Sequence, residues 1–204
     1  MQYFYHILYG VLMAYFGLIS PGMLNMTALK IRINYGKVAS VKFSIGAAIV
    51  VFFQAGIALY FANYFNHNPT IISLLKTIAI FVFIALSIFF YILSRKELNP
   101  KPTKQSGNYF VKGIAMSSIN MLAIPFYLGL SIYLTSVNKL IIEQPYILLF
   151  VIGAGLGSFL IFYTYIVFAR IIILKVSFIA KNINIILSLL FLMLAIFTLV
   201  KILQ

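Results

Sequence analysis

Acidic residues and cysteines are what this chain lacks most. It has no cysteine, which excludes disulfides and thiolate chemistry, and Asp and Glu together number 2 in 204 residues. Both acids, Glu97 and Glu143, fall in predicted loops. The histidines, His6 and His67, lie near the predicted membrane ends, where His6 is most simply an interfacial residue. No cluster has metal-ligand spacing. We therefore expect no enzyme, no bound metal and no cofactor.

The chain also lacks a polar stretch long enough to fold separately. Hydrophobic residues make up 64% of it and charged residues 8%. A soluble domain of this length could not bury so much apolar surface. The sequence therefore predicts one transmembrane domain over 1–204, embedded in the lipid bilayer. No Lys or Arg precedes Lys30 and no small-residue cleavage pattern is present, so the first helix is expected to be retained.

Six apolar segments are long enough to cross a hydrocarbon core of ~30 Å. They lie near 4–24, 43–65, 71–93, 113–136, 146–169 and 183–203. The predicted fold class is an all-α polytopic membrane protein with six transmembrane helices in two inverted three-helix repeats. Repeat one covers 1–95, a cytoplasmic linker 96–112, and repeat two 113–204. An odd number of spans in each half inverts the second half, as in many transporters. A short similarity between 24–28 and 119–123 supports the repeat.

The basic residues predict the orientation. Of the 15 Lys and Arg residues, all but Lys76, Lys139 and Lys201 fall in the first, third and fifth connections between the segments. The positive-inside rule places those connections in the cytoplasm and both termini on the outer side of the cell membrane, whether that is an inner or a plasma membrane. The net charge of +13 is thereby explained by topology, and we expect no nucleic-acid partner.

The first apolar segment is interrupted at Ser20, Pro21 and Gly22. Proline removes a backbone donor and glycine loosens the turn, so the helix is expected to break or kink there. Within a membrane the freed backbone groups are tolerated only where protein buries them or where they line a cavity, which transporters use to hold substrate. We expect Pro125 to kink the fourth helix in the same way.

Three amide side chains complete the predicted substrate path: Asn25, Gln54 and Asn120. For Gln54 two roles stay open, namely interhelical hydrogen bonding and contact with substrate. For Asn25 and Asn120 the two open roles are capping of freed backbone at a helix break and contact with substrate. In the fifth segment Gly153 and Gly157 form a GxxxG spacing. This spacing allows close helix approach, either inside the monomer or in a homodimer.

At Ser20-Pro21-Gly22 and the downstream Tyr35-Gly36 the sequence resembles the LysE-type (LysE/RhtB) amino-acid exporter family. Gly46 falls on the glycine that opens that family's second-helix motif, and Gly113 and Asn120 match two positions of an element in the second half. The chain departs from the family at Val50 and Val51, where the family often has Gly-Asp.

The resemblance implies a membrane transporter that exports amino acids or related small polar metabolites by alternating access. Because the acidic residue of the second helix is missing, cationic substrates are not expected. The alternative is a non-transporting membrane scaffold or partner subunit that retains the transporter fold. Loss of intramembrane carboxylates favours this alternative, and retention of Ser20-Pro21-Gly22 argues against it.

Overall fold

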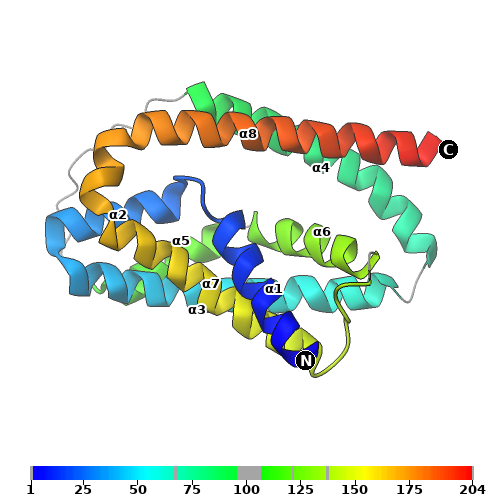
Figure 1. The fold of residues 1–204 in the computed structure, drawn as a ribbon, viewed down its shortest axis with the longest axis horizontal. Coiled ribbons are helices and arrows are strands. Elements are labelled where there is room, and N and C mark those ends of the chain that lie inside the picture. The colour runs from blue at the N-terminus through cyan, green and yellow to red at the C-terminus, as the bar shows by residue number, and fades with distance from the viewer. Residues whose placement is uncertain (1, 67–68, 96–106, 121, 137, 204) are drawn as a thin grey trace. The chain divides into compact units, whose positions relative to one another are not determined.

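The structure is a computed structural model that describes residues 2–66, 69–95, 107–120, 122–136 and 138–203. Every secondary-structure element in these ranges is a helix, so the predicted all-α class is confirmed (Figure 1). The helices are α1 (Gln2–Gly17), α2 (Met23–Tyr35), α3 (Lys37–Asn66), α4 (Pro69–Arg95), α5 (Tyr109–Ile119), α6 (Ala123–Ser136), α7 (Tyr146–Val167) and α8 (Ala169–Leu203). Most of the predicted linker, 96–106, and His67 lie outside the described residues.

Within these described ranges, two helices are long and apolar enough to cross a membrane, namely Lys37–Phe65 in α3 and Tyr146–Val167, which is α7. A third candidate is the pair formed by α5 and α6, which meet at a bend of 62°. These three correspond to the spans predicted near 43–65, 146–169 and 113–136. The other three spans, and with them the six-span inverted repeat, stay predictions.

The chain divides by its internal contacts into two compact units. The first comprises 1–64 and 100–174, and the second 65–99 and 175–204. In the second unit α4 pairs with the later part of α8: the Ser87 hydroxyl donates to the Ser188 carbonyl over 2.9 Å, and Phe90 stacks on Phe191 with ring centroids 5.6 Å apart. All residues of the predicted substrate path lie in the first unit.

In the first unit, α1 crosses α7 at a contact made by glycines (Figure 1). A Cβ atom on Gly10 would collide with the Phe150 carbonyl oxygen and would lie 2.8 Å from the amide nitrogen of Ala154. Cβ atoms on Gly153 and Gly157 would collide with backbone atoms of α1. The two glycines of the GxxxG spacing therefore pack against a helix of the same chain, where any larger residue would push the backbones apart.

A second crossing joins α3 to α5, again through glycines. A Cβ atom on Gly113 would collide with the Phe43 carbonyl oxygen and would lie 3.0 Å from the amide nitrogen of Ala47. In return, a Cβ atom on Gly46 would collide with the Phe110 carbonyl oxygen. Two positions that carry the family resemblance, Gly46 and Gly113, thus face each other across one helix contact.

The two crossings are built from the same residue pattern. Residues 43–47 read Phe-Ser-Ile-Gly-Ala and residues 150–154 read Phe-Val-Ile-Gly-Ala. In each crossing the partner glycine approaches the phenylalanine carbonyl and the alanine amide. The similarity between 24–28 and 119–123 has no such structural counterpart, because the first stretch lies inside α2 and the second runs from the end of α5 into α6. That short similarity therefore does not support the repeat.

Candidate functional site

The first helix break separates α1, which ends at Gly17, from α2, which begins at Met23. It falls at Ser20–Gly22, as the sequence predicts. Asn25, in the first turn of α2 and 3% exposed, turns back into the break. Its side-chain nitrogen donates to the Leu18 carbonyl over 2.5 Å and to the Ser20 carbonyl over 2.6 Å. Asn25 therefore satisfies backbone acceptors that the interrupted helix leaves free.

A tyrosine from α7 completes the closure of this break. The Tyr165 hydroxyl donates to the Ile19 carbonyl over 2.8 Å. Three successive carbonyls, from Leu18 to Ser20, thus accept hydrogen bonds from side chains. Tyr165 was not predicted from the sequence, because a tyrosine near the end of a span is more often an interfacial anchor.

The second break separates α5, which ends at Ile119, from α6, which begins at Ala123. Here the donor comes from another helix. Gln54, near the middle of α3 and 6% exposed, donates from its side-chain nitrogen to the carbonyls of Ser117 and Asn120, each over 3.1 Å. The Ser117 hydroxyl in turn donates to the Ala47 carbonyl over 3.1 Å. The structure therefore brings Gln54 and Asn120 together.

We expected Pro125 to kink the fourth predicted span from within, and it does not. The chain breaks before it, and Pro125 is the third residue of α6. In the first turn of a helix an amide has no intrahelical acceptor, so proline costs nothing there. Pro125 consequently starts a helix rather than bending one.

The two breaks share one unusual feature. Within the described residues, Asn25 Oδ1 and Gln54 Oε1 are buried and have no hydrogen-bond partner. Both side-chain nitrogens donate to backbone carbonyls, whereas both oxygens are enclosed by protein. A buried acceptor without a partner costs about 1–3 kcal/mol. Both breaks therefore carry the same local cost.

The remaining predicted residues lie close to the same breaks. Pro21 is buried, Gly22 and Ser20 are partly buried, and Asn120 is the half-buried residue that follows α5. The end of α1 approaches the start of α6, since a Cβ atom on Gly17 would collide with the Phe126 ring. The two breaks are thus near neighbours in the first unit.

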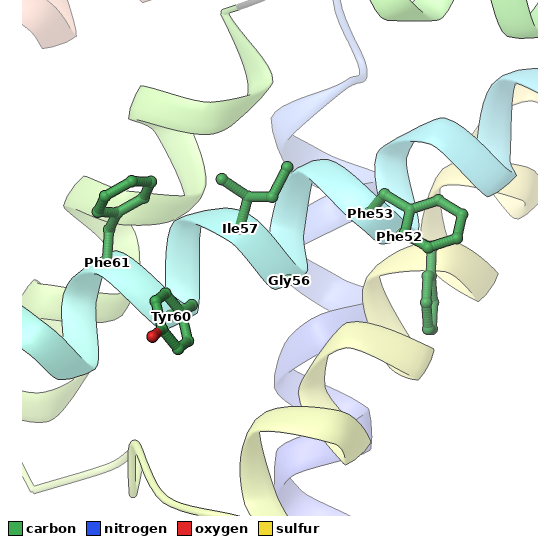
Figure 2. Close-up of a pocket in the computed structure, with 6 residues that line it drawn as sticks. All are labelled: Phe52, Phe53, Gly56, Ile57, Tyr60 and Phe61. Atoms are coloured by element: carbon green, nitrogen blue, oxygen red, sulfur yellow. The ribbon is translucent and has the colours of Figure 1, made fainter.

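Two shallow hollows lie along α3 in the described part of the chain. The larger, about 410 Å³, is lined entirely by α3 residues, as Figure 2 shows: Phe52, Phe53, Gly56, Ile57, Tyr60 and Phe61. The smaller, about 300 Å³, reaches the second break and is lined by Val50, Phe53, Gln54, Ile57, Ser118 and Ile124. Neither hollow is bounded by both Pro21 and Pro125, between which we expected a substrate cavity. The second hollow nevertheless includes Gln54, one of the predicted path residues.

His6 has a structural role that the sequence did not reveal. It is 2% exposed, its Nδ1 lies 2.8 Å from the Gln2 carbonyl oxygen, and its Nε2 accepts a hydrogen bond from the Ile141 amide over 3.0 Å. An Nε2 that accepts leaves the ring proton on Nδ1, which donates to Gln2. His6 thereby fastens α1 to the segment before α7.

No family model, curated protein or solved structure matches the chain. The interpretation of the site therefore depends on its own geometry. Among the described residues, no three His, Cys, Asp or Glu side chains lie together in a group that could hold a metal ion.

Proposed function

We propose that the protein is a multi-pass transporter of the cell membrane that exports amino acids or related small polar metabolites by alternating access. The observation that carries this proposal is the pair of helix breaks, each closed by a buried amide whose oxygen has no partner. Broken helices at membrane depth are typical of transporter substrate sites. The resemblance to the LysE-type family, at Ser20-Pro21-Gly22 and at Gly46 and Gly113, supports the same function.

The arrangement of helices supports two inverted repeats. Each half contains a broken pair (α1 with α2, α5 with α6) followed by two longer helices. In the first half α1 crosses α7 of the second half, and in the second half α5 crosses α3 of the first half. Both crossings use the same glycine pattern. Gln54 of α3 also donates a hydrogen bond to the break between α5 and α6, and Tyr165 of α7 donates one to the break between α1 and α2. Rocking of one repeat against the other would alter both breaks together.

The freed carbonyls are not the recognition groups in this proposal. The carbonyls of Leu18, Ile19 and Ser20 already accept from protein side chains. Recognition is therefore assigned to the half-buried side chain of Asn120, beside which Gln54 holds the second break closed. Ser20, Pro21, Gly22 and Pro125 act through the backbone by setting where the helices stop and restart.

The test is efflux from vesicles that contain the purified protein and are loaded with a panel of labelled amino acids. We expect release of at least one class by the native chain and its loss in Asn120→Leu. Asn34→Leu makes the same substitution at an exposed position of α2 and should transport normally. Native-level efflux from a correctly inserted Asn120→Leu protein would contradict the role of Asn120. Absence of efflux from the native chain, for every amino acid tested, would contradict the function.

Two observations favour the alternative of a membrane scaffold or partner subunit without transport activity. The carbonyls named above are satisfied within the protein, and the larger hollow is apolar and formed by a single helix. In a scaffold, Asn25 and Gln54 would only stabilise the breaks. A scaffold would fail the efflux assay while remaining fully folded.

A further inference from the structure

Five basic residues lie at one end of the first unit, where α2 meets the starts of α3 and α5. We call this region the basic end, and its residues are Lys30, Arg32, Lys37, Lys42 and Lys112. The Ser40 hydroxyl of α3 donates to the Ala28 carbonyl of α2 over 2.5 Å. The Tyr35 ring of α2 lies 5.3 Å from the Tyr109 ring of α5. These two contacts hold the three helices together at this end.

Two of the lysines flank the glycine contact between α3 and α5. Lys42 precedes Phe43, and Lys112 precedes Gly113, where an added Cβ atom would collide with the Phe43 carbonyl oxygen. Lys42 and Lys112 therefore come from neighbouring turns of two crossing helices. The positive charges of α2, α3 and α5 are concentrated in one region of the first unit.

The chain offers this end little negative charge of its own, because its acidic residues are only Glu97 and Glu143. The Lys37 ammonium lies 5.3 Å from the centre of the Tyr163 ring, near the end of α7. Glu143 precedes Tyr146, the first residue of α7. The helix rise places Tyr146 about 25 Å from Tyr163, which is about three Debye lengths at physiological ionic strength. Glu97 lies outside the described residues and offsets at most one of the five charges.

Tyrosine side chains indicate the depth of the basic end in a membrane. Tyr35, Tyr109 and Tyr163 lie among its basic residues. Tyrosines are enriched at the level of the lipid headgroups, and lysine side chains extend to the same level. Lys37 and Lys42 are exposed. A lipid headgroup at this level can therefore contact the ammonium groups without leaving the bilayer.

We propose that the basic end binds the headgroups of anionic phospholipids in preference to zwitterionic ones. An anionic headgroup brings the negative charge that the protein does not supply, whereas the choline of phosphatidylcholine cancels the charge of its phosphate. The positive-inside rule concerns only the side of the membrane on which basic residues lie. The proposal adds a lipid selectivity at one surface, and it rests on the membrane placement of the proposed function.

The chain contains no tryptophan, so a single introduced tryptophan reports on its own surroundings. Ile33→Trp places the fluorophore on α2 at the basic end, and Leu148→Trp, in the first turn of α7, is the matched control. The two native side chains are 45% and 49% exposed. The full-length variants are reconstituted into vesicles of phosphatidylcholine and phosphatidylglycerol in equal parts, with dibrominated chains on one lipid or the other. Because bromine quenches tryptophan on contact, the two quenching levels give the relative affinity of the two lipids at each position.

We expect phosphatidylglycerol to be favoured at least threefold at Ile33→Trp, and neither lipid to be favoured at Leu148→Trp. Raising the salt to about 1 M, where the Debye length is about 3 Å, should remove the preference. Equal quenching by the two lipids at Ile33→Trp would overturn the proposal. An equal preference at Leu148→Trp, or one that salt does not alter, would also overturn it.

Charge substitutions in the Ile33→Trp background test the lysines themselves. Lys37→Gln with Lys42→Gln removes two exposed charges, and we expect the preference to fall at least twofold. Lys37→Arg with Lys42→Arg keeps the charges and should retain the preference. Lys139→Gln, at an exposed position before α7, should have no effect. A full preference in the double glutamine variant would contradict the assignment.

Two soluble anions test other occupants of the same surface. Inorganic phosphate, compared with sodium chloride at equal ionic strength, should leave the lipid preference unchanged. If phosphate alone removed the preference, the basic end would be a site for free phosphate. Polyglutamate should compete only as its ionic strength predicts, and stronger competition would reassign the surface to an acidic protein segment.

The same vesicles separate this proposal from the proposed function. Efflux of amino acids without any lipid preference leaves the export function standing and removes the lipid site. A lipid preference without efflux retains the lipid site and removes the export function. If neither lipid quenched either tryptophan, the membrane placement would be contradicted, and both proposals with it.

Discussion

Replacement of Gly10 by alanine should destabilise the first unit strongly, because the added methyl group has no room. It would collide with the Phe150 carbonyl oxygen and lie 2.8 Å from the Ala154 nitrogen and 3.0 Å from the Gly153 carbonyl carbon. All three are backbone atoms, which cannot rotate aside, so α1 and α7 must move apart. Overpacking of this kind costs about 1–3 kcal/mol, and the rigid neighbours place this site at the upper end.

The control is Gly129→Ala in α6. Gly129 is exposed, and no neighbouring atom lies within 4 Å of the place that an added methyl group would take, so alanine there gains up to about 1 kcal/mol of helix propensity. Gly10→Ala makes the same propensity gain but loses about 3 kcal/mol to the collision, so the two variants should differ by about 3 kcal/mol. At roughly 2–4 °C per kcal/mol for a chain of this size, the gap in melting temperature is about 6–12 °C.

Far-UV circular dichroism in detergent measures this gap without needing cysteine or tryptophan. Gly113→Ala at the α3–α5 crossing should behave like Gly10→Ala, since it meets the Phe43 carbonyl in the same way. If Gly10→Ala melted within about 2 °C of Gly129→Ala, the close α1–α7 crossing would be refuted.

Two more substitutions test the side chains that close the backbone. Asn25→Leu leaves the Leu18 carbonyl without its donor, while the Ser20 carbonyl keeps the Gly22 amide at 2.6 Å. One orphaned acceptor should cost about 1–3 kcal/mol and lower the melting temperature. An unchanged melting temperature would show that Asn25 does not stabilise the break. His6→Phe keeps an aromatic ring but removes the acceptor of the Ile141 amide. We expect a loss of stability of similar size and faster proteolysis around residues 138–145. The substitution Phe4→Tyr, at an exposed position, should alter neither the stability nor the proteolysis.

The sequence predicted local features better than the contacts between distant segments. The break at Pro21 follows from the residues around it, because a missing donor and a flexible glycine act locally. Gln54 was correctly identified as a buried amide in need of a partner. Its partners, the carbonyls of Ser117 and Asn120, lie more than sixty positions further along the chain, and no local pattern indicates them.

Other features were misread because burial, rather than residue type, decides their role. His6 was placed near a membrane end as an interfacial residue, yet it is buried and hydrogen-bonded on both ring nitrogens. The break before α6 was assigned to Pro125, although it begins at Asn120. The repeated Phe-x-Ile-Gly-Ala pattern at 43–47 and 150–154 was visible in the sequence. Its meaning depends on which helix each glycine faces, and only the structure shows that.

In the proposed exporter, recognition has to work without an acidic residue in the second helix. A carboxylate beside a substrate ammonium attracts it electrostatically, but a carboxylate without a partner is costly to hold inside a membrane. An amide such as Asn120 offers an acceptor without that charge, while the Gln54 nitrogen holds the broken helix beside it. Binding would then be weaker per contact and favour solutes whose aliphatic body adds apolar burial.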